Sequence, residues 1–475
     1  MRIVLFYMAL SFQAAMLFAQ TTQTIVIKAD EKIHAIRPDF WGTNLLYWID
    51  DDASLSDGGL RQGIKDAGLR LLRYPGGTVA DNFHWRSGTL DNINMFPFQS
   101  GAAETDFDEF IALCRQSRAE PMCVLNTESW AIKNDVKGGA HEAAEWLRYC
   151  KRQHYQVKYW EIGNETYWHP VLSASEYADL VNIYADSLKN VDPEIILGVN
   201  GHWDIDFVGT KERIRPSSLS EVLALRRNIN SRADHKQYET FTKKETTLPI
   251  TSGAQKWWPT VAAKCGDKID MIIVHWYFAP AQLDLVAEKL NQLQRLWKNA
   301  HPAKDYVFNM SEFNVTTKTP QSFMHLTEMM GLLLNTGFDL SAIWPMRMEY
   351  KKPVLFNYKD HQPSIFNQVF RRLSNQLTGH LVPVSSTGPL HAYAAHSEGQ
   401  TSVVLSGRKV KEALSATLQL EGTSSGRRKC SVWRISGDEF DYKMKEELLP
   451  VVGGRVTFLV HPSEVVIAVF NKSTG

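Results

Sequence analysis

Two short segments of this 475-residue chain each bring a glutamate to the end of an apolar, aromatic run. The first spans residues 159–165 and the second spans residues 309–315, and each is typical of a buried strand. Glu165 and Glu312 would then stand at the carboxyl ends of two strands. Two carboxyl groups about 5 to 5.5 Å apart, one protonated and one ionised, carry out the hydrolysis of a glycosidic bond with retention of configuration. The pair therefore indicates a retaining glycosidase.

The two carboxyl groups need unlike surroundings for this chemistry. We predict that Glu165 is the general acid/base, in a pocket that raises its pKa. We predict that Glu312 is the nucleophile, kept ionised by a nearby cation and hydrogen-bond donors. Glu161 has the strand parity of Glu165 and is interpreted as an interior structural carboxylate, with Glu128 and Asp81 as weaker competitors for a catalytic role.

Strand-like and helix-like runs alternate between about residue 40 and residue 377, the order that builds a parallel sheet. The eight predicted strands are residues 41–44, 69–74, 121–126, 157–162, 195–199, 269–276, 306–311 and 340–344. Amphipathic helices are predicted at 106–118, at 177–188 after a capping box of Ser173 and Glu176, and at 281–298. Eight such units predict a (β/α)8 TIM barrel, whose carboxyl strand ends surround one pocket.

The chain divides into four predicted parts. Residues 1–19 have the basic start, apolar run and small residues of a signal peptide, so we expect export to the periplasm or the medium. Residues 20–38 supply a strand to a later sheet, and residues 39–377 form the barrel. Short alternating runs separated by Gly and Ser predict a C-terminal antiparallel β-sandwich at 378–475. The polar segment 206–257 fits a helical excursion over the site or a solvated loop equally well.

Composition favours a neutral ligand. The chain has 52 basic and 52 acidic residues, so it has no net positive charge to attract nucleic acid or an anionic membrane. We predict neither partner after signal removal, and we expect an oligosaccharide or polysaccharide substrate. The 14 Trp and 16 Tyr residues suit stacking on sugars. The five cysteines are dispersed and lack metal-ligand spacing, so we expect small buried hydrophobes.

The motifs around the two glutamates resemble those of the clan A glycoside hydrolases. That clan has a (β/α)8 barrel, an Asn-Glu acid/base on strand four and a nucleophilic Glu on strand seven, which Asn164-Glu165 and Glu312 match. Residues 72–77, 83–85 and 275–277 resemble most closely glycoside hydrolase family 51, the α-L-arabinofuranosidases, with relatives in families 39 and 30.

The resemblance implies supporting roles for four further residues. Arg73 resembles the clan's arginine beside the nucleophile, and Tyr277 resembles the tyrosine that donates a hydrogen bond to it. Asn164 would hold the 2-hydroxyl group of the sugar. His275 would orient the acid/base or the sugar.

Aromatic and amide side chains complete the predicted site. Trp344 looks like the aromatic floor of clan members, and Asn126 follows the third strand, where it would bind substrate. Trp130, Trp168 and Trp258 are further candidates for stacking on a sugar.

The sequence thus predicts a secreted retaining exo-α-L-arabinofuranosidase acting on fragments of plant or algal polysaccharide. A β-glycosidase or endo-glycanase acting on xylan, β-glucan or galactan uses the same chemistry and stays open. A non-catalytic glycan-binding barrel is the remaining alternative, although both carboxylates are present. The expected reaction needs no metal ion or organic cofactor.

Overall fold

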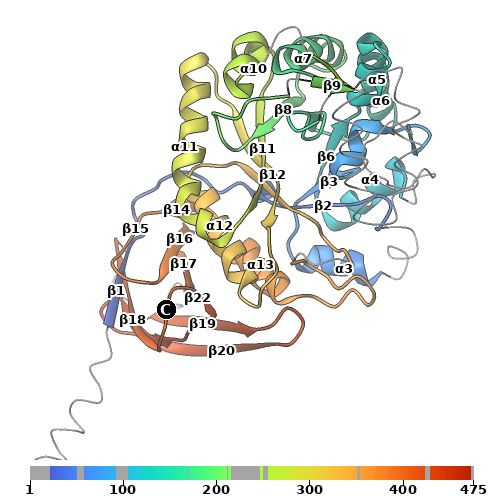
Figure 1. The fold of residues 1–475 in the computed structure, drawn as a ribbon. Coiled ribbons are helices and arrows are strands. Elements are labelled where there is room, and N and C mark those ends of the chain that lie inside the picture. The colour runs from blue at the N-terminus through green and yellow to red at the C-terminus, as the bar shows by residue number, and fades with distance from the viewer. Residues whose placement is uncertain are drawn as a thin grey trace, which may run out of the picture.

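A computed structural model gives the fold in Figure 1. It describes residues 22–50, 58–91, 105–169, 171–210, 212–214, 247–249, 255–349, 353–422 and 428–471. The predicted signal peptide at 1–19 lies outside these residues, as does most of the segment 206–257. Within that segment β9 (Glu212–Ile214) pairs with β10 (Thr247–Pro249) as an antiparallel ribbon.

Eight parallel strands close into a barrel, as predicted. Their order around the barrel is β11-β12-β13-β2-β3-β6-β7-β8, so strands that follow one another along the chain are also neighbours in space. Each predicted strand coincides with one observed strand within a few residues. The barrel strands are β2 (Trp41–Asn44), β3 (Leu71–Tyr74), β6 (Glu120–Leu125), β7 (Tyr159–Ile162), β8 (Ile196–His202), β11 (Met271–Phe278), β12 (Val307–Val315) and β13 (Leu340–Ile343).

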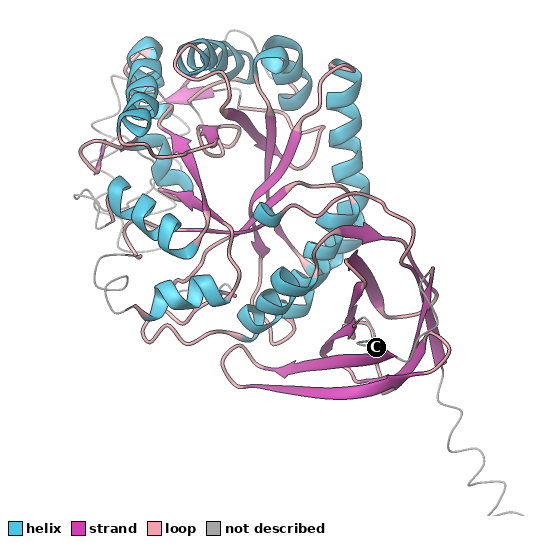
Figure 2. Ribbon diagram, turned by 180° about the vertical axis from the view of Figure 1, so that it is seen from behind, coloured by secondary structure: helices cyan, strands magenta, loops and turns pink. Residues whose placement is uncertain are grey.

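Helices surround the barrel (Figure 2). The α4 helix begins with a capping box at Asp106 and ends at Arg118, whose left-handed backbone stops it. The α7 helix begins with the predicted capping box of Ser173 and Glu176. The described helices are α3 (Gly59–Asp66), α4 (Phe107–Ser117), α5 (Glu128–Ile132), α6 (Val136–Arg152), α7 (Ala174–Lys189), α10 (Trp257–Cys265), α11 (Leu283–Ala300), α12 (Ser322–Asn335) and α13 (Ile365–Gln376).

Short elements connect these parts. Two of them, η2 and the β4–β5 hairpin, follow β3 on the face where the barrel strands end. The short elements are η1 (Pro38–Phe40), η2 (Gly77–Asn82), β4 (Phe83–His84), β5 (Thr89–Leu90), η4 (Gly266–Lys268) and η5 (Pro280–Gln282).

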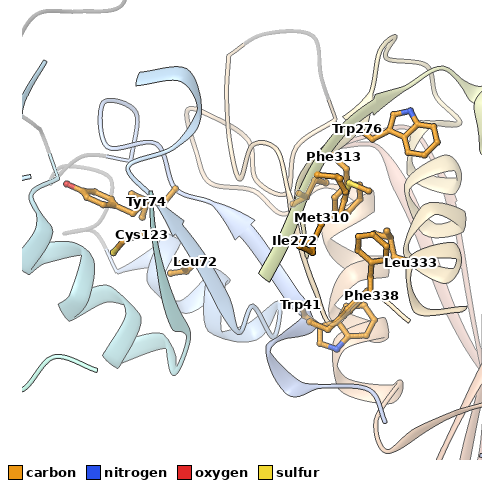
Figure 3. Close-up of a cluster of buried hydrophobic side chains, with 14 of the residues drawn as sticks. Trp41, Leu72, Tyr74, Cys123, Ile272, Trp276, Met310, Phe313, Leu333 and Phe338 are labelled. Carbon is orange, nitrogen blue, oxygen red and sulfur yellow. The ribbon is translucent and has the colours of Figure 1, made fainter. Parts of the chain in front are cut away.

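The apolar core has two layers in the barrel. A cluster of six fully buried side chains plugs the barrel interior: Leu71, Met122, Tyr159, Met271, Ile273 and Leu340. The alternate residues of the same strands face the helices and form the larger core, part of which Figure 3 shows around Trp41, Met310 and Phe313. The apolar cluster leaves the carboxyl-terminal end of the barrel interior for the polar site.

The C-terminal region forms two packed sheets. One sheet has the order β15-β1-β18-β21 and the other β14-β16-β17-β22-β19-β20. Their pairings are antiparallel, as predicted, except that β1 runs parallel to β18. The strands are β1 (Thr22–Lys28), β14 (His380–Val382), β15 (Val384–Ser386), β16 (His391–Ser397), β17 (Gln400–Ser406), β18 (Leu414–Glu421), β19 (Arg428–Gly437), β20 (Tyr442–Val451), β21 (Arg455–Val460) and β22 (Glu464–Phe470).

The sandwich packs on the barrel through α12 and α13 (Figure 1). Gly331 of α12 lies so close to Tyr393 that a β-carbon there would come within 2.4 Å of the ring. All five cysteines are buried and unbridged, as expected. No helix in the described part of the chain is long and apolar enough to span a membrane.

Candidate active site

The two glutamates selected from the sequence face one another at the carboxyl end of the barrel. Glu312 lies within β12, and Glu165 follows the end of β7 by three residues. The Nδ1 atom of His275 lies 3.0 Å from Glu165 Oε1 and 3.7 Å from Glu312 Oε2. One carboxylate oxygen of each glutamate and a ring nitrogen of His275 all lie within 4.8 Å of one another. This separation is shorter than the roughly 6.5 to 9.5 Å between the two carboxyl groups of inverting glycosidases.

Local backbone irregularities place these side chains. Gly163 and Glu165 both have positive φ, 73° and 48°, so the chain turns sharply after β7 and directs Glu165 across the pocket. The register of β11 against β12 shifts between Val274 and His275, which sets His275 opposite Glu312.

Arg73 forms buried ion pairs with two glutamates, Glu312 and Glu161. The side chain is fully buried and donates from Nη1 to Glu312 Oε1 at 2.7 Å and from Nε to Glu161 Oε2 at 2.7 Å. Burial alone lowers its pKa, but the charges of Glu161 and Glu312 raise the pKa above the ordinary value, so the guanidinium stays charged. Tyr277 donates to the other oxygen, Glu312 Oε2, at 2.7 Å.

His275 contacts Glu165 and shifts its pKa. Its Nδ1 faces Glu165, and its Nε2 lies 2.8 Å from Ser311 Oγ. Burial is the largest influence on the pKa of Glu165 and raises it, but the hydrogen bond from His275 and the charges of His275, His169 and Arg73 lower the pKa below the ordinary value of 4.5. The prediction of a raised pKa for Glu165 is therefore wrong. The pKa of His275 is raised instead, against burial, chiefly by the charge of Glu312 and the hydrogen bond to Glu165.

Two asparagines offer amide atoms to a ligand. Asn164 accepts from Arg73 Nη2 at 2.7 Å through Oδ1, while its Nδ2 has no hydrogen-bond partner among the described residues. Asn126 is 6% exposed, and neither atom of its side-chain amide has a partner within the described part of the chain. Buried amides seldom stay unpaired, so both point to a polar ligand such as a sugar hydroxyl group.

The predicted aromatic residues divide into three environments. Trp344 is half-buried against Gly77, where an added β-carbon would meet its ring at 2.5 Å. Trp168 is 54% exposed and packs edge-on against His202 and Phe207. Trp130 is half-buried with its indole nitrogen on Glu142, and Trp258 is fully buried core, so Trp258 is excluded as a stacking surface.

Three residues of the site were not selected from the sequence: Asn44, Ser311 and Tyr167. Asn44, at the end of β2, accepts from Arg73 Nη1 at 2.8 Å and donates to the backbone of Ser311 at 2.9 Å. Ser311 holds His275, and Tyr167 Oη lies 3.5 Å from Glu165 Oε1. Asn44 could have been selected from the sequence, because it ends a predicted barrel strand. Nothing in the sequence distinguishes Ser311 and Tyr167, whose contacts appear only in the folded chain.

Two groups of side chains bring three potential metal ligands together. The first is the catalytic group of Glu165, His275 and Glu312. Arg73 and Tyr277 already occupy the oxygens of Glu312, and the guanidinium charge opposes a cation there. The second group consists of Asp81, Glu128 and His169, and its Asp81 accepts from the backbone N–H of Asn164, the residue before Glu165.

No family model matches the chain. Alpha-L-arabinofuranosidase C of Emericella nidulans is 29% identical over 183 residues, which are 33% of this chain and 35% of that protein. An intracellular exo-alpha-L-arabinofuranosidase of Bacteroides ovatus is 25% identical over 233 residues, 41% of this chain and 44% of that protein. The matches thus span less than half the length of these curated relatives.

A solved structure shares the fold over nearly the whole chain. The GH51 alpha-L-arabinofuranosidase of Thermotoga petrophila superposes with a TM-score of 0.70 at 17% sequence identity, covering 94% of this chain and 99% of that one. The TIM barrel with its C-terminal β-domain is therefore confirmed. The sequence matches to alpha-L-arabinofuranosidases and this shared fold agree with the predicted resemblance to the clan A glycoside hydrolases.

Proposed function

We propose that this chain is a retaining glycoside hydrolase that removes α-L-arabinofuranosyl groups from plant or algal polysaccharide fragments. The observation that carries the proposal is the convergence of Glu165, Glu312 and one ring nitrogen of His275 within 4.8 Å. The names of the matching relatives favour the arabinofuranosyl group. The apolar start at residues 1–19 favours export.

In the first step Glu312 attacks the anomeric carbon and expels the leaving group. Arg73 and Tyr277 each orient one oxygen of Glu312 by a hydrogen bond. Positive charge develops on the sugar ring in the transition state. His275 passes a proton from Nδ1 to Glu165, and Glu165 donates this proton to the departing oxygen. Because ester formation removes the charge of Glu312 that raises the pKa of His275, proton loss from His275 becomes favourable as the bond forms.

In the second step a water molecule replaces the leaving group. Glu165, now ionised, takes a proton from this water, and the oxygen attacks the anomeric carbon of the glycosyl ester. Glu312 leaves as a carboxylate, and its returning charge restores the proton to His275. Two inversions give net retention.

Asn164 and Asn126 account for binding of the sugar. The Nδ2 of Asn164 has no hydrogen-bond partner among the described residues and lies on the residue before Glu165. It therefore suits the 2-hydroxyl group, where hydrogen bonds strengthen in the transition state. Trp344 beside Gly77 supplies an apolar floor for the ring.

A panel of aryl glycosides tests the proposal. We expect the purified protein to hydrolyse nitrophenyl α-L-arabinofuranoside faster than the xyloside, glucoside and galactoside, and the Glu312→Gln variant to lose this activity. Preference for the xyloside or glucoside would instead support the β-glycosidase alternative. Absence of activity on every glycoside, in a protein that binds oligosaccharides, would support the non-catalytic barrel.

A further inference from the structure

A second buried cluster lies behind the acid/base. Asp81 lies in η2, which follows β3, Glu128 begins α5 after β6, and His169 follows β7. Three consecutive barrel strands therefore each lead to one residue of the cluster. The three residues are 0%, 4% and 6% exposed. One carboxylate oxygen of each acid and one imidazole nitrogen lie within 4.8 Å of one another. Three strand ends thus build one enclosed group of potential ligands.

One oxygen of this cluster is left without a partner. Asp81 Oδ1 accepts from Thr127 Oγ1 at 2.8 Å and from the backbone N–H of Asn164 at 2.9 Å. Asp81 Oδ2 has no hydrogen-bond partner among the residues that the structure describes, and it lies 4.0 Å from His169 Nδ1. The other acid, Glu128, contacts His169 Nδ1 directly. A fully buried, unpaired carboxylate oxygen directed at an imidazole and a second carboxylate calls for a positive partner.

The cluster holds two acids and one base. Ionisation of both acids would leave an excess negative charge in this buried space even with His169 protonated. Burial and the charge of Glu128 push the pKa of Asp81 well above its ordinary value. The carboxylates in turn raise the pKa of His169 to about 9, although burial lowers it. A divalent cation in place of the imidazole proton would neutralise both acids.

We propose that Asp81, Glu128 and His169 bind a divalent first-row transition ion of the Zn²⁺ class. Two carboxylate oxygens and one imidazole nitrogen are a donor set suited to zinc, with ligand bonds of about 2.0 to 2.2 Å. Calcium and magnesium prefer all-oxygen sites, so the imidazole selects against them. Binding requires His169 to lose its Nδ1 proton and exchange its contact with Glu128 for the metal.

The ion would act as an anchor for the acid/base turn. The same Asp81 carboxylate that would bind the metal accepts from the backbone N–H of Asn164, next to Glu165. Fixing Asp81 therefore fixes the turn with positive φ at Gly163 and Glu165. The proposed ion is positioning rather than catalytic and does not depend on which sugar the protein hydrolyses.

Zinc binding is tested with the full chain carrying no polyhistidine tag. After treatment with a chelator and desalting, ZnCl₂ is titrated by isothermal calorimetry, with melting temperatures recorded with and without zinc. We expect one equivalent to bind the native chain and raise its melting temperature. Asp81→Asn and His169→Gln should each weaken binding by about a hundredfold or more and abolish the shift.

A matched variant separates this cluster from the catalytic one. Glu312→Gln changes the other group of potential ligands and should bind zinc as the native chain does. Loss of binding in Glu312→Gln, with binding intact in Asp81→Asn, would overturn the assignment. So would a native chain that takes up no zinc, or one that prefers CaCl₂, because the cluster would then be a proton-sharing network or a site of another class.

Discussion

At the scale of single residues, the proposed mechanism uses a fixed carboxylate on Glu312 and a proton shared by Glu165 and His275. Arg73 and Tyr277 each hold one oxygen of Glu312, so the nucleophile has one orientation. Glu165 is 20% exposed at its side chain while Glu312 is 4% exposed, which leaves the acid/base open to a leaving group and to water. In the proposed mechanism the proton moves between Glu165 and His275, which are 3.0 Å apart.

Removing the Tyr277 hydroxyl tests the aim of the nucleophile. We expect Tyr277→Phe to lower kcat/KM by about 10²-fold, the usual loss for one preorganised donor at a reacting oxygen. Steady-state kinetics on the best aryl glycoside measure this. Tyr306→Phe is the control, because the Tyr306 hydroxyl donates to the backbone of Gly266 outside the site, and it should retain native kinetics.

The proton on His275 predicts the alkaline limb of the pH profile. Because the pKa of His275 is raised above 6.5, the His275–Glu165 pair keeps its proton as pH rises past that value. The alkaline limb of kcat/KM should therefore lie above pH 6.5. In His275→Gln the limb should move to lower pH, since Glu165 alone then holds the proton, while His301→Gln, at the end of α11, should leave it unchanged. A native limb below pH 6.5 would contradict this account of the proton.

At the scale of elements, the carboxyl ends of β3, β7, β11 and β12 converge on the reacting centre. The sequence predicts this much because apolar runs and caps are local signals, and because parallel strand ends meet at one face. Local signals do not reveal the bulge before His275 or the positive φ of Glu165. The lowered pKa of Glu165 escaped prediction for the same reason, since it depends on His275, which is 110 residues away.

Substitution of Gly77 tests the proposed role of Trp344 as an apolar surface for the sugar ring. An alanine there needs positive φ of 56° and places its β-carbon 2.5 Å from Trp344, so the ring must move. We expect Gly77→Ala to lower kcat/KM by about tenfold or more, through KM, with backbone strain of about 1 to 2 kcal/mol. Gly453→Ala has a similar φ of 60° with no atom within 4 Å, so it should show the strain in its melting temperature without the loss of activity.

At the scale of the whole molecule, the sandwich is fastened to the barrel by a buried ion pair. Glu328 of α12 accepts from Arg408 Nη2 at 2.7 Å and from Ser406 Oγ at 2.7 Å. The two charged side chains are 4% and 14% exposed. The pairing of β1 with β18 adds a second connection, because it ties the start of the described chain to the C-terminal sheet.

Breaking this pair should loosen the junction. Arg408→Ala leaves the Glu328 charge buried without its cation, so we expect a loss of about 3 kcal/mol in unfolding free energy, measured by denaturant titration. Lys409→Ala is the neighbouring control, because its pair with Asp284 is largely exposed and should contribute little. Equal effects of the two substitutions would contradict a buried, structural role for Arg408.

A double displacement through Glu312 is tested most directly by the configuration of the first-formed product. The best aryl glycoside is hydrolysed in the presence of methanol, and proton NMR identifies the anomer of the methyl glycoside that forms. Two inversions at a carboxyl separation this short predict a methyl glycoside with the anomeric configuration of the substrate. A methyl glycoside of inverted configuration would contradict the account.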